Sequence, residues 1–393
     1  MPSTGKQKML LLSGRLGDGH KQAALALAET AKQHRPDMET ELRDFMEWTH
    51  PYLHEVSRYL FIQGVKAFPS VYGFLYQKTR DDNSLSSMFK KIRLFGLNRM
   101  MQLIRETNPS VVVSTFPSAA AAMSILKQEG LTDVPTVTVI TDHTDHSYWI
   151  HPMTDKYLVG SDPVKQALRR RGVLPGHIEV TGIPVRPQFY GRYDMHKLRL
   201  KYGLDPHTPA VLVMGGGCGI IGEDAVEMIS SRLFPRPVQF IAVCGHNRKL
   251  QESLTESALH APHPVKVFGF VDEIHELMAL SNLIITKPGG LTTSEALALG
   301  VPMLLYHALP GQEEDNARIL CGSGAAVHAR HGHLFRELQQ LLLFPRRLEI
   351  MREKSKDFSG LHAAERALDT IIHTSGNRPI QPAAELILVG GGV

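Results

Sequence analysis

A glycine-rich segment near the N-terminus ends on a histidine, and this combination of residue types can support acid–base chemistry. In residues 10–20, "LLLSGRLGDGH", a short apolar run passes into a turn that holds Gly14, Gly17 and Gly19 before His20. The apolar run predicts a buried parallel strand, and the alanine-rich residues after His20 predict a helix packed closely on a sheet. His20 is then expected at a helix N-terminus, where the helix dipole disfavours imidazolium and favours a neutral proton acceptor. The alternative is a glycine turn with a surface histidine.

A second glycine cluster could approach a phosphate group. It stands between an apolar strand and a helix that begins near Glu223, and it consists of Gly215, Gly216, Gly217 and Gly219. Glycines let the backbone come close to a phosphate, and a helix N-terminus supplies N–H donors. The cluster lacks the Gly-Lys-Ser/Thr ending of a nucleotide hydrolase loop, and the next strand ends in Gly245-His246 without an acidic residue. Both departures argue against hydrolase chemistry and against NAD.

The densest set of candidate binding residues lies in residues 281–320. A strand at 283–286 is followed by a turn and a helix start that contain Gly289, Gly290, Leu291 and Thr292. Backbone N–H groups and threonine hydroxyls at such a helix start form a diphosphate cradle. Glu295 lies in the first helical turn, where a carboxylate can accept two hydrogen bonds from ribose hydroxyls; a helix-capping acid is the alternative.

A second turn, "HALPGQEEDNA", follows the next apolar run. Gln312 and Glu313 offer polar groups suited to reading sugar hydroxyls, and Asn316 lies on the helix that comes after them.

Such residues need a scaffold that brings strand ends together. The sequence shows the alternation of strand-like and helix-like runs that such a scaffold requires. Strand-like runs alternate with helix-like ones in two series, at 8–12, 111–115, 136–141 and 156–159, and then at 210–214, 238–244, 283–286 and 302–306. The alternation predicts parallel sheets with crossover helices. We therefore predict an α/β protein of two doubly wound, Rossmann-like domains that face each other across a cleft. They are residues 1–190 and residues 191–375, the second with a C-terminal helix at 361–373, followed by a tail at 376–393.

Composition sets the limits on the class of protein. A chain of 393 residues exceeds one ordinary core, and 43% hydrophobic with 21% charged residues is typical of globular proteins. A net charge of +4 is too weak to indicate nucleic-acid binding. The three cysteines lack metal-ligand spacing and fit a reducing compartment. No apolar run is long enough for a signal peptide or a spanning helix, so we expect a cytosolic or peripheral membrane protein.

Residues 48–105 depart from the α/β rhythm and suggest a membrane surface. They mix aromatic and basic residues with few acids, and "SSMFKKIRLFGLNRMMQLIRE" has the pattern of a basic amphipathic helix. Met88, Ile92, Phe95 and Met100 can share or adjoin one face of it. This pattern is typical of an interfacial helix on anionic lipid. The alternative is an ordinary domain helix with a solvated basic face.

Several stretches together resemble one known family. "KPGGLTTSEALALGVPMLLYHALPGQEEDNA" is similar to the donor-binding segment of glycosyltransferases of the GT-B fold, and "GRLGDGH" is similar to their Gly-x-Gly-His acceptor-side loop. "ITDHTDHSYWIHPMTDKYLVGSDPVKQAL" and "VTGIPVRPQF" resemble the branch of bacterial diacylglycerol glucosyltransferases and plant-type monogalactosyldiacylglycerol synthases. The peptidoglycan-precursor N-acetylglucosaminyltransferase is a more distant relation. Asp18, between the two glycines, departs from the family pattern, in which a small residue is common.

The resemblance implies a role for each candidate residue. His20 would be the general base or shape the acceptor site, with Gly19 beside the donor, and Arg186 would face the donor phosphates. Gly215, Gly216 and Gly217 would close on the diphosphate. Phe270 and Val271 would present backbone groups to uracil. The remaining donor contacts would come from Gly289, Gly290, Leu291 and Thr292 for diphosphate and sugar, Glu295 for the ribose, Gln312 with Glu313 for the hexose, and Asn316 as a further donor-binding residue.

The stretch "TDHTDH" contains Asp142, His143, Asp145 and His146, which have the chemistry of metal ligands. It is similar to a family loop that is not a metal site, and the chain has no Asp-x-Asp motif. We therefore predict no metal and no other cofactor, with Asp142 and His146 positioning the acceptor or supporting His20.

The implied reaction is transfer of a hexose, glucose in the first place, from a UDP-sugar to the 3-hydroxyl of 1,2-diacylglycerol with inversion. Transfer could be processive, and the protein is expected at the cytoplasmic face of the cell membrane. Three alternatives stay open: a galactosyl or N-acetylglucosaminyl transferase on another lipid acceptor, a UDP-sugar epimerase of the same fold, and a non-catalytic UDP-sugar sensor. The sequence does not set the hexose, the number of sugars added or the oligomeric state.

Overall fold

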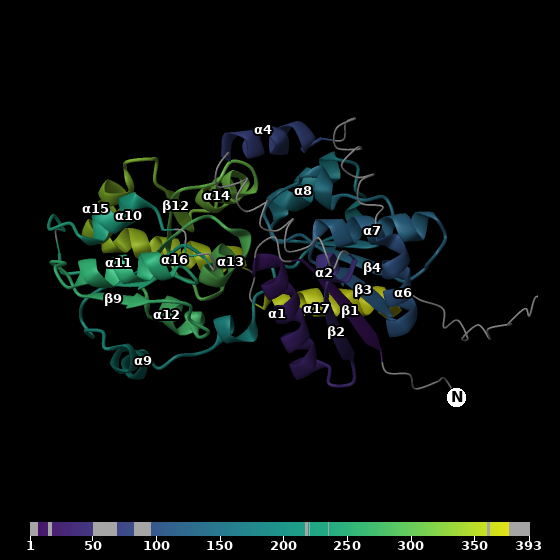
Figure 1. The fold of residues 1–393 in the computed structure, drawn as a ribbon, viewed down its shortest axis with the longest axis horizontal. Helices are drawn as coiled ribbons and strands as arrows, with labels where there is room; N and C mark the ends of the chain where they lie inside the picture. The colour runs from purple at the N-terminus through teal and green to yellow at the C-terminus, as the bar shows by residue number, and fades with distance from the viewer. Residues whose placement is uncertain are drawn as a thin grey trace, which may run out of the picture.

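The computed structural model describes residues 7–14, 18–49, 69–81, 96–216, 219, 221–234, 236–359 and 362–376. In these residues the chain forms two halves, each built on a parallel six-stranded sheet (Figure 1). The strand order is β2-β1-β3-β4-β5-β6 in the first sheet and β12-β11-β10-β7-β8-β9 in the second. Helices cover both faces of each sheet, so the predicted pair of doubly wound sheets is confirmed.

The first half comprises six strands: β1 (Lys8–Ser13), β2 (Glu39–Asp44), β3 (Val111–Ser114), β4 (Thr136–Val139), β5 (Lys156–Val159) and β6 (Ile178–Val180). Its helices are α1 (Asp18–His34), α2 (Phe45–Thr49), α4 (Pro69–Thr79), α6 (Leu97–Thr107), α7 (Pro117–Gln128) and α8 (Asp162–Arg170), with short 3-10 helices η1 (Ser147–Trp149), η2 (Pro175–His177) and η3 (Pro187–Tyr190). Along β1, Leu10 and Leu12 pack under α6 and α7, while Met9 and Leu11 pack under α1. This alternation buries both faces of the strand, as a central parallel strand requires.

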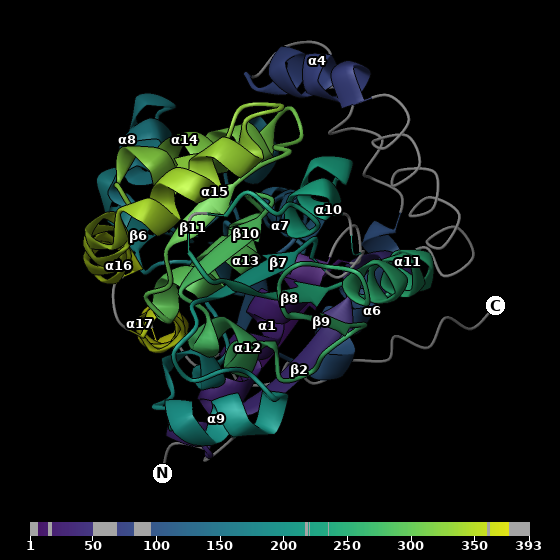
Figure 2. The same ribbon diagram turned by 90° about the vertical axis from the view of Figure 1, so that its left-hand side faces the viewer.

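The second half comprises six further strands: β7 (Ala210–Met214), β8 (Gln239–Val243), β9 (Val265–Phe268), β10 (Leu283–Thr286), β11 (Met303–Leu305) and β12 (Ala326–His328). Its helices are α9 (Met195–Tyr202), α10 (Glu223–Ile229), α11 (Arg248–Ala258), α12 (Ile274–Leu280), α13 (Gly290–Ala298), α14 (Gln312–Gly322), α15 (Leu334–Leu343) and α16 (Pro345–Ser359). Figure 2 looks onto this half and shows its strands following one another from β11 to β9.

The C-terminal helix forms as predicted, but it packs on the other half. In α17 (Ala363–Gly376), Ala367, Leu368 and Ile371 join the core beneath β1 and β3. Figure 1 shows this helix within the first half, beside α1. The sequence predicts a helix here from its apolar spacing, but spacing alone cannot say which sheet the apolar face covers.

The basic segment at 48–105 divides into described and undescribed parts. Residues 50–68 and 82–95, including Met88, Ile92 and Phe95, lie outside the described residues. Within α6, Met100 and Leu103 are buried in the core beneath β1 and β3. Met100 therefore belongs to the protein interior, and the expectation that it contributes to a membrane-facing surface is wrong. None of the helices in the described residues combines the length and hydropathy needed to cross a bilayer.

Candidate functional site

The N-termini of α1 and α13 meet between the two sheets. Helix α1 follows the carboxyl end of β1, and α13 follows the carboxyl end of β10, the edge at which parallel α/β sheets bind ligands. A Cβ atom built on Gly19 would lie 3.7 Å from the Cβ atom of Leu291. Two helix N-termini from different halves therefore face each other, one beginning next to His20 and the other at Gly290.

His20 lies in a partly buried site at the start of α1. Its Nδ1 atom is 2.9 Å from the Oγ1 atom of Thr141, which follows β4, and its ring contacts the rings of Phe116 and Trp149. Burial lowers the pKa of His20 to about 4, against the smaller opposing effect of a hydrogen bond to the Thr115 backbone. The predicted neutral imidazole is therefore explained chiefly by desolvation rather than by the helix dipole.

The first half touches the N-terminus of α13 directly. A Cβ atom built on Gly290 would lie 2.1 Å from the backbone oxygen of Thr141 and 2.8 Å from an oxygen of Asp142, so only glycine fits this position. The Asp142 carboxylate accepts hydrogen bonds from the Gly290 backbone and, at 2.9 Å, from the side-chain amide of Asn316. Burial nevertheless raises the pKa of Asp142 to about 6. Gly289 precedes the helix as its N-cap, and Leu291 and Thr292 are half-buried in its first turn.

Glu295 is buried one turn into α13. Burial raises the pKa of its carboxyl group to about 8, and Arg186 acts in the opposite direction. The Arg186 guanidinium lies 2.8 Å from a carboxylate oxygen of Glu29 on α1. In this structure Arg186 thus pairs with Glu29 and acts electrostatically on Glu295, and its predicted role at the donor phosphates stays a prediction.

The loop before α14 brings the candidate sugar-reading residues to the same place. The Oε1 atom of Gln312 accepts a hydrogen bond of 2.7 Å from the hydroxyl of Tyr72 on α4. Glu313 accepts a hydrogen bond from the Leu309 backbone, and its other oxygen lies 3.6 Å from the Nζ atom of Lys287. Lys287 thus brings a positive charge next to the α13 N-terminus.

Asn316 connects the two halves. Its side chain accepts a 2.6 Å hydrogen bond from the His143 backbone and donates to Asp142 and to the backbone oxygen of Pro288. The residue is fully buried, so its three hydrogen bonds fix the strand-end loops of both halves against each other.

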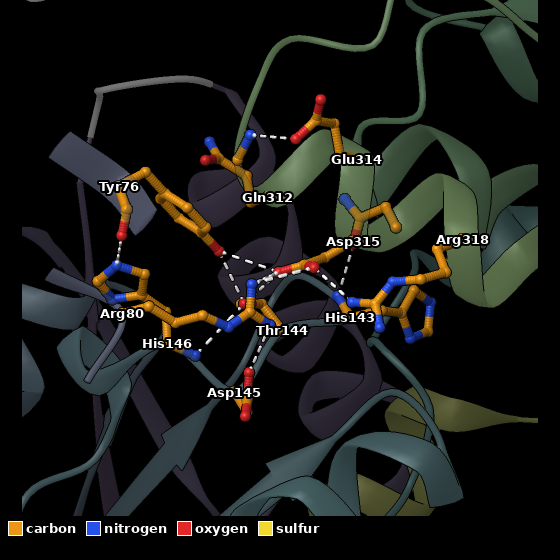
Figure 3. Close-up of polar contacts among 12 residues, drawn as sticks. Tyr76, Arg80, His143, Thr144, Asp145, His146, Gln312, Glu314, Asp315 and Arg318 are labelled. Atoms are coloured by element: carbon orange, nitrogen blue, oxygen red, sulfur yellow. Dashed lines mark hydrogen bonds and ion pairs between the residues drawn. The ribbon is translucent and has the colours of Figure 1, made fainter. Parts of the chain in front are cut away.

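Helix α4 adds a second connection, drawn in Figure 3. Tyr76 points from α4 between Thr144 and Asp315, with its hydroxyl 2.7 Å from the Oγ1 atom of Thr144 and 3.4 Å from a carboxylate oxygen of Asp315. Arg80, just after the helix, pairs with Asp145 at 2.6 Å and with Asp315 at 2.9 Å. Charged partners from both halves thereby hold α4 at their junction.

The four metal-type side chains of "TDHTDH" turn to different partners. Asp142 caps α13, His143 lies 3.2 Å from Ser161, and Asp145 pairs with Arg80 and Arg171. His146 is buried, lies 3.0 Å from the backbone oxygen of Tyr76, and has its pKa lowered to about 4 chiefly by burial. Its ring contacts α4 and Tyr148, whereas Thr141 contacts His20. Across the described ranges, no group of three or more acidic, histidine or cysteine side chains gathers as metal ligands.

The glycine loop after β7 and the turn after β9 lie at the carboxyl edge of the second sheet. Gly215 and Gly216 follow β7, with Gly216 at φ +69°, whereas Gly217 lies outside the described residues. After β9, the exposed ring of Phe270 stacks on His246 with centroids 4.4 Å apart, and Val271 packs partly into the core. Strand β7 lies next to β10, the strand that leads into α13, whereas β9 is the edge strand and is separated from β10 by β7 and β8.

Comparisons with known proteins show the family of this chain. The family model for monogalactosyldiacylglycerol (MGDG) synthase matches residues 20–185, and the model for the glycosyltransferase family 28 C-terminal domain matches residues 210–366. A processive diacylglycerol beta-glucosyltransferase of Bacillus pumilus is 32% identical over 370 residues, which cover 94% of this chain and 95% of the relative. The chain belongs to the diacylglycerol glucosyltransferase family.

Solved structures place this family member in the GT-B fold. MurG of Acinetobacter baumannii superposes with a TM-score of 0.60 at 16% identity, over 94% of this chain and 100% of MurG. UDP-GlcNAc 2-epimerase of Neisseria meningitidis, bound to UDP-GlcNAc, superposes with a TM-score of 0.59 at 15% identity, over 93% and 100% of the two chains. At these identities the match shows the fold alone, because one fold supports several reactions.

The predictions from the sequence of this family member did not include the residues that contact the predicted site residues and hold them in place. Thr141 supports His20, Lys287 lies beside Glu313, and Tyr72 bonds Gln312. Lys287 stands directly before the Pro-Gly-Gly turn, so its position next to a helix N-terminus could have marked it. Tyr72 lies 240 residues from Gln312, and only the tertiary fold brings them together.

Proposed function

We propose that this protein transfers a hexose, with glucose as the first candidate, from a UDP-sugar to the 3-hydroxyl of 1,2-diacylglycerol with inversion. The observation that carries the proposal is the approach of the two helix N-termini, with Gly19 next to Leu291. The N-terminus of α1 supplies a neutral histidine, and the N-terminus of α13 supplies N–H groups that can bind an anion. Relatives named processive diacylglycerol beta-glucosyltransferase align with 94% of the chain, which supports the proposal.

In the proposed reaction His20 accepts the proton of the acceptor hydroxyl. The hydroxyl oxygen forms a bond to C1 of the hexose while the bond from C1 to the diphosphate oxygen breaks, and UDP leaves with that electron pair. The pKa of about 4 keeps the imidazole neutral in the free protein. A bound diphosphate next to the ring raises this pKa, since a nearby negative charge favours imidazolium, and so strengthens the base when the donor is present.

Leaving-group stabilisation is assigned to α13 and its neighbours. Backbone N–H groups at Gly290, Leu291 and Thr292 point charge-stabilising dipoles at the diphosphate, and Lys287 adds a positive charge. Arg186 can turn from Glu29 to the phosphates when the donor binds. Glu295 holds the ribose, Gln312 and Glu313 hold the hexose, and Phe270 with Val271 borders the uracil. No metal is needed in this scheme, because backbone dipoles and side-chain cations carry the charge.

The acceptor is proposed to arrive from a membrane surface at α4. The outward face of α4 exposes Val71, Phe74 and Leu75, and Phe74 is 61% accessible. Lys78 lies on the same helix with its Nζ atom 5.6 Å from the centre of the Phe74 ring. Apolar side chains beside a base suit the interface of an anionic bilayer. We place the protein on the cytoplasmic face as a peripheral protein.

One assay tests the function directly. The full chain is incubated with UDP-glucose or UDP-galactose and vesicles of diacylglycerol with anionic phospholipid, and glycolipid and released UDP are both measured. We expect glycolipid and UDP in equal amounts for the first sugar added. Release of UDP without glycolipid, or conversion of the UDP-sugar without any lipid, would reject lipid glycosylation in favour of hydrolysis or epimerisation.

A further inference from the structure

Helix α4 has two different faces, and one of them packs across the junction of the halves. Gly73, Tyr76 and Thr79 are buried on the inner face, whereas Val71 and Phe74 are exposed on the outer face. Both views show the helix at the outer edge of the molecule, next to α14 (Figures 1 and 2). In sequence α4 lies between elements of the first half, yet its inner face contacts the second half.

The contacts fall on the turn directly before Gln312, the first residue of α14. A Cβ atom built on Gly73 would lie 2.3 Å from the Cβ atom of Pro310, so only glycine permits this approach. Gly311 adopts φ +110°, and a Cβ atom built on it would lie 3.0 Å from the ring of Tyr76. Two glycines, one on each side, therefore allow α4 to press directly on residues 310 and 311.

Tyr72 then reaches the functional group of Gln312. Its hydroxyl donates to the Oε1 atom at 2.7 Å. Because burial raises the pKa of Tyr72 to about 12, the hydroxyl keeps its proton at neutral pH and remains a donor. This hydrogen bond fixes which end of the amide faces Tyr72, so the NH2 group is turned away from Tyr72 and can donate to a ligand. In the described part of the chain that NH2 group has no hydrogen-bond partner.

We infer that Tyr72 is a positioning residue for donor recognition: it fixes the amide of Gln312 so that the NH2 group is presented to the hexose. The inference rests on the proposed function, since it names what sets the sugar contact of the same site. Both halves then contribute to the hexose site, because Tyr72 of the first half orients Gln312 of the second half. A UDP molecule without hexose does not use this contact.

The test compares UDP with UDP-glucose in the wild-type chain and in Tyr72→Phe. The ratio of the Kd of UDP to the Kd of UDP-glucose, measured by titration calorimetry, reports the contribution of the hexose. We expect Tyr72→Phe to lower this ratio by about three- to tenfold, the usual range for one hydrogen bond, and to leave the Kd of UDP unchanged. A purely structural loss would instead weaken both ligands alike and lower the Tm.

A matched control and a double variant separate the causes. Tyr202→Phe removes a tyrosine hydroxyl that donates to Glu276, away from the site, and should change neither Kd. In a Gln312→Ala background, Tyr72→Phe should have no further effect, because the hydroxyl acts through the amide.

Three results would overturn the inference that Tyr72 positions Gln312. An unchanged ratio in Tyr72→Phe, or a wild-type ratio of one, removes the positioning role even if the wild-type chain glycosylates diacylglycerol. Absence of UDP binding by the wild-type chain rejects the proposed function and this inference together.

Discussion

The carboxylate of Asp142 accepts a hydrogen bond from the backbone of Gly290, so a side chain of the first half caps the N-terminus of α13. Asn316 donates a second hydrogen bond to the same carboxylate. An acidic side chain thus occupies the helix end at which we propose that the donor diphosphate binds. Asp142 and the donor would compete for the same N–H groups and repel each other.

Replacing Asp142 by asparagine should therefore strengthen UDP binding. Asp142→Asn keeps the size of the side chain but removes the negative charge, and we expect the Kd of UDP to fall about three- to tenfold. Titration calorimetry measures this directly, with Asp18→Asn as a control that removes an exposed carboxylate at the start of α1. Equal or weaker UDP binding by Asp142→Asn would mean that the carboxylate does not compete with the donor.

Removal of the His20 imidazole should separate turnover from donor binding. We expect His20→Ala to lower kcat by about 10²- to 10⁴-fold, the usual contribution of a general base, with the Kd of UDP nearly unchanged. The acid limb of the wild-type profile of kcat/KM against pH should lie below the ordinary histidine value, towards about 4, because burial keeps the ring neutral. Normal turnover by His20→Ala would disprove the assignment.

Because of Glu295, the free energy of unfolding should fall as the pH rises. Its folded pKa of about 8 exceeds the unfolded value of 4.5, so the folded protein binds more protons between these values, and stability falls as the pH rises through that window. Glu295→Gln should remove this fall between pH 6.5 and pH 8, and raise the Tm at pH 8 by roughly 1–2 °C, for about 1 kcal/mol. The same variant should bind UDP more weakly, since an amide accepts fewer ribose hydrogen bonds. Thermal unfolding and UDP titration would decide, and identical pH profiles for the two proteins would contradict the assignment.

The outer face of α4 should govern attachment to vesicles. Phe74→Glu replaces the most exposed aromatic ring of this face by a charge, and we expect about tenfold weaker binding to anionic vesicles in a sedimentation assay. Leu233→Glu, at an exposed apolar residue of the second half, is the matched control and should bind vesicles normally. Equal losses in the two variants would show that α4 has no special role at the membrane.

Metal chelation should leave transfer intact. In the structure, the acidic and histidine side chains of "TDHTDH" are engaged with separate protein groups, and the cations near α13 are Lys287 and Arg186. Dialysis against a chelator should therefore leave the rate of glycolipid formation unchanged. A rate that falls and recovers on adding a divalent cation would contradict this expectation.

The central strands could be predicted from the sequence, and the edge strands could not. All eight predicted runs form strands, from β1 to β11, whereas the four that were missed are β2, β6, β9 and β12. Each of these four lies at an edge of its sheet. A central parallel strand is buried on both faces and reads as a continuous apolar run, while an edge strand such as "ETELRD" carries the charges of an exposed position.

The site was predictable only as far as local patterns reach. His20, Gly290 and Glu295 stand at helix starts that glycine turns mark in the sequence. Their partners come from elsewhere: Thr141 for His20, and Asp142 for Gly290. Such contacts depend on how two separately folded sheets face each other, which no short segment encodes.

The packing of α17 on the first sheet means that the polypeptide crosses between the halves twice, once near η3 and again after α16. A fragment ending at residue 190 would leave Met9, Leu11 and Val111 without the apolar cover that Leu368 and Ile371 provide. Neither half can then be expected to express as an independent soluble unit. Two covalent crossings permit the halves to bend relative to each other but resist rotation about their long axis. Opening of the interface should therefore be a hinge bending about the two crossings.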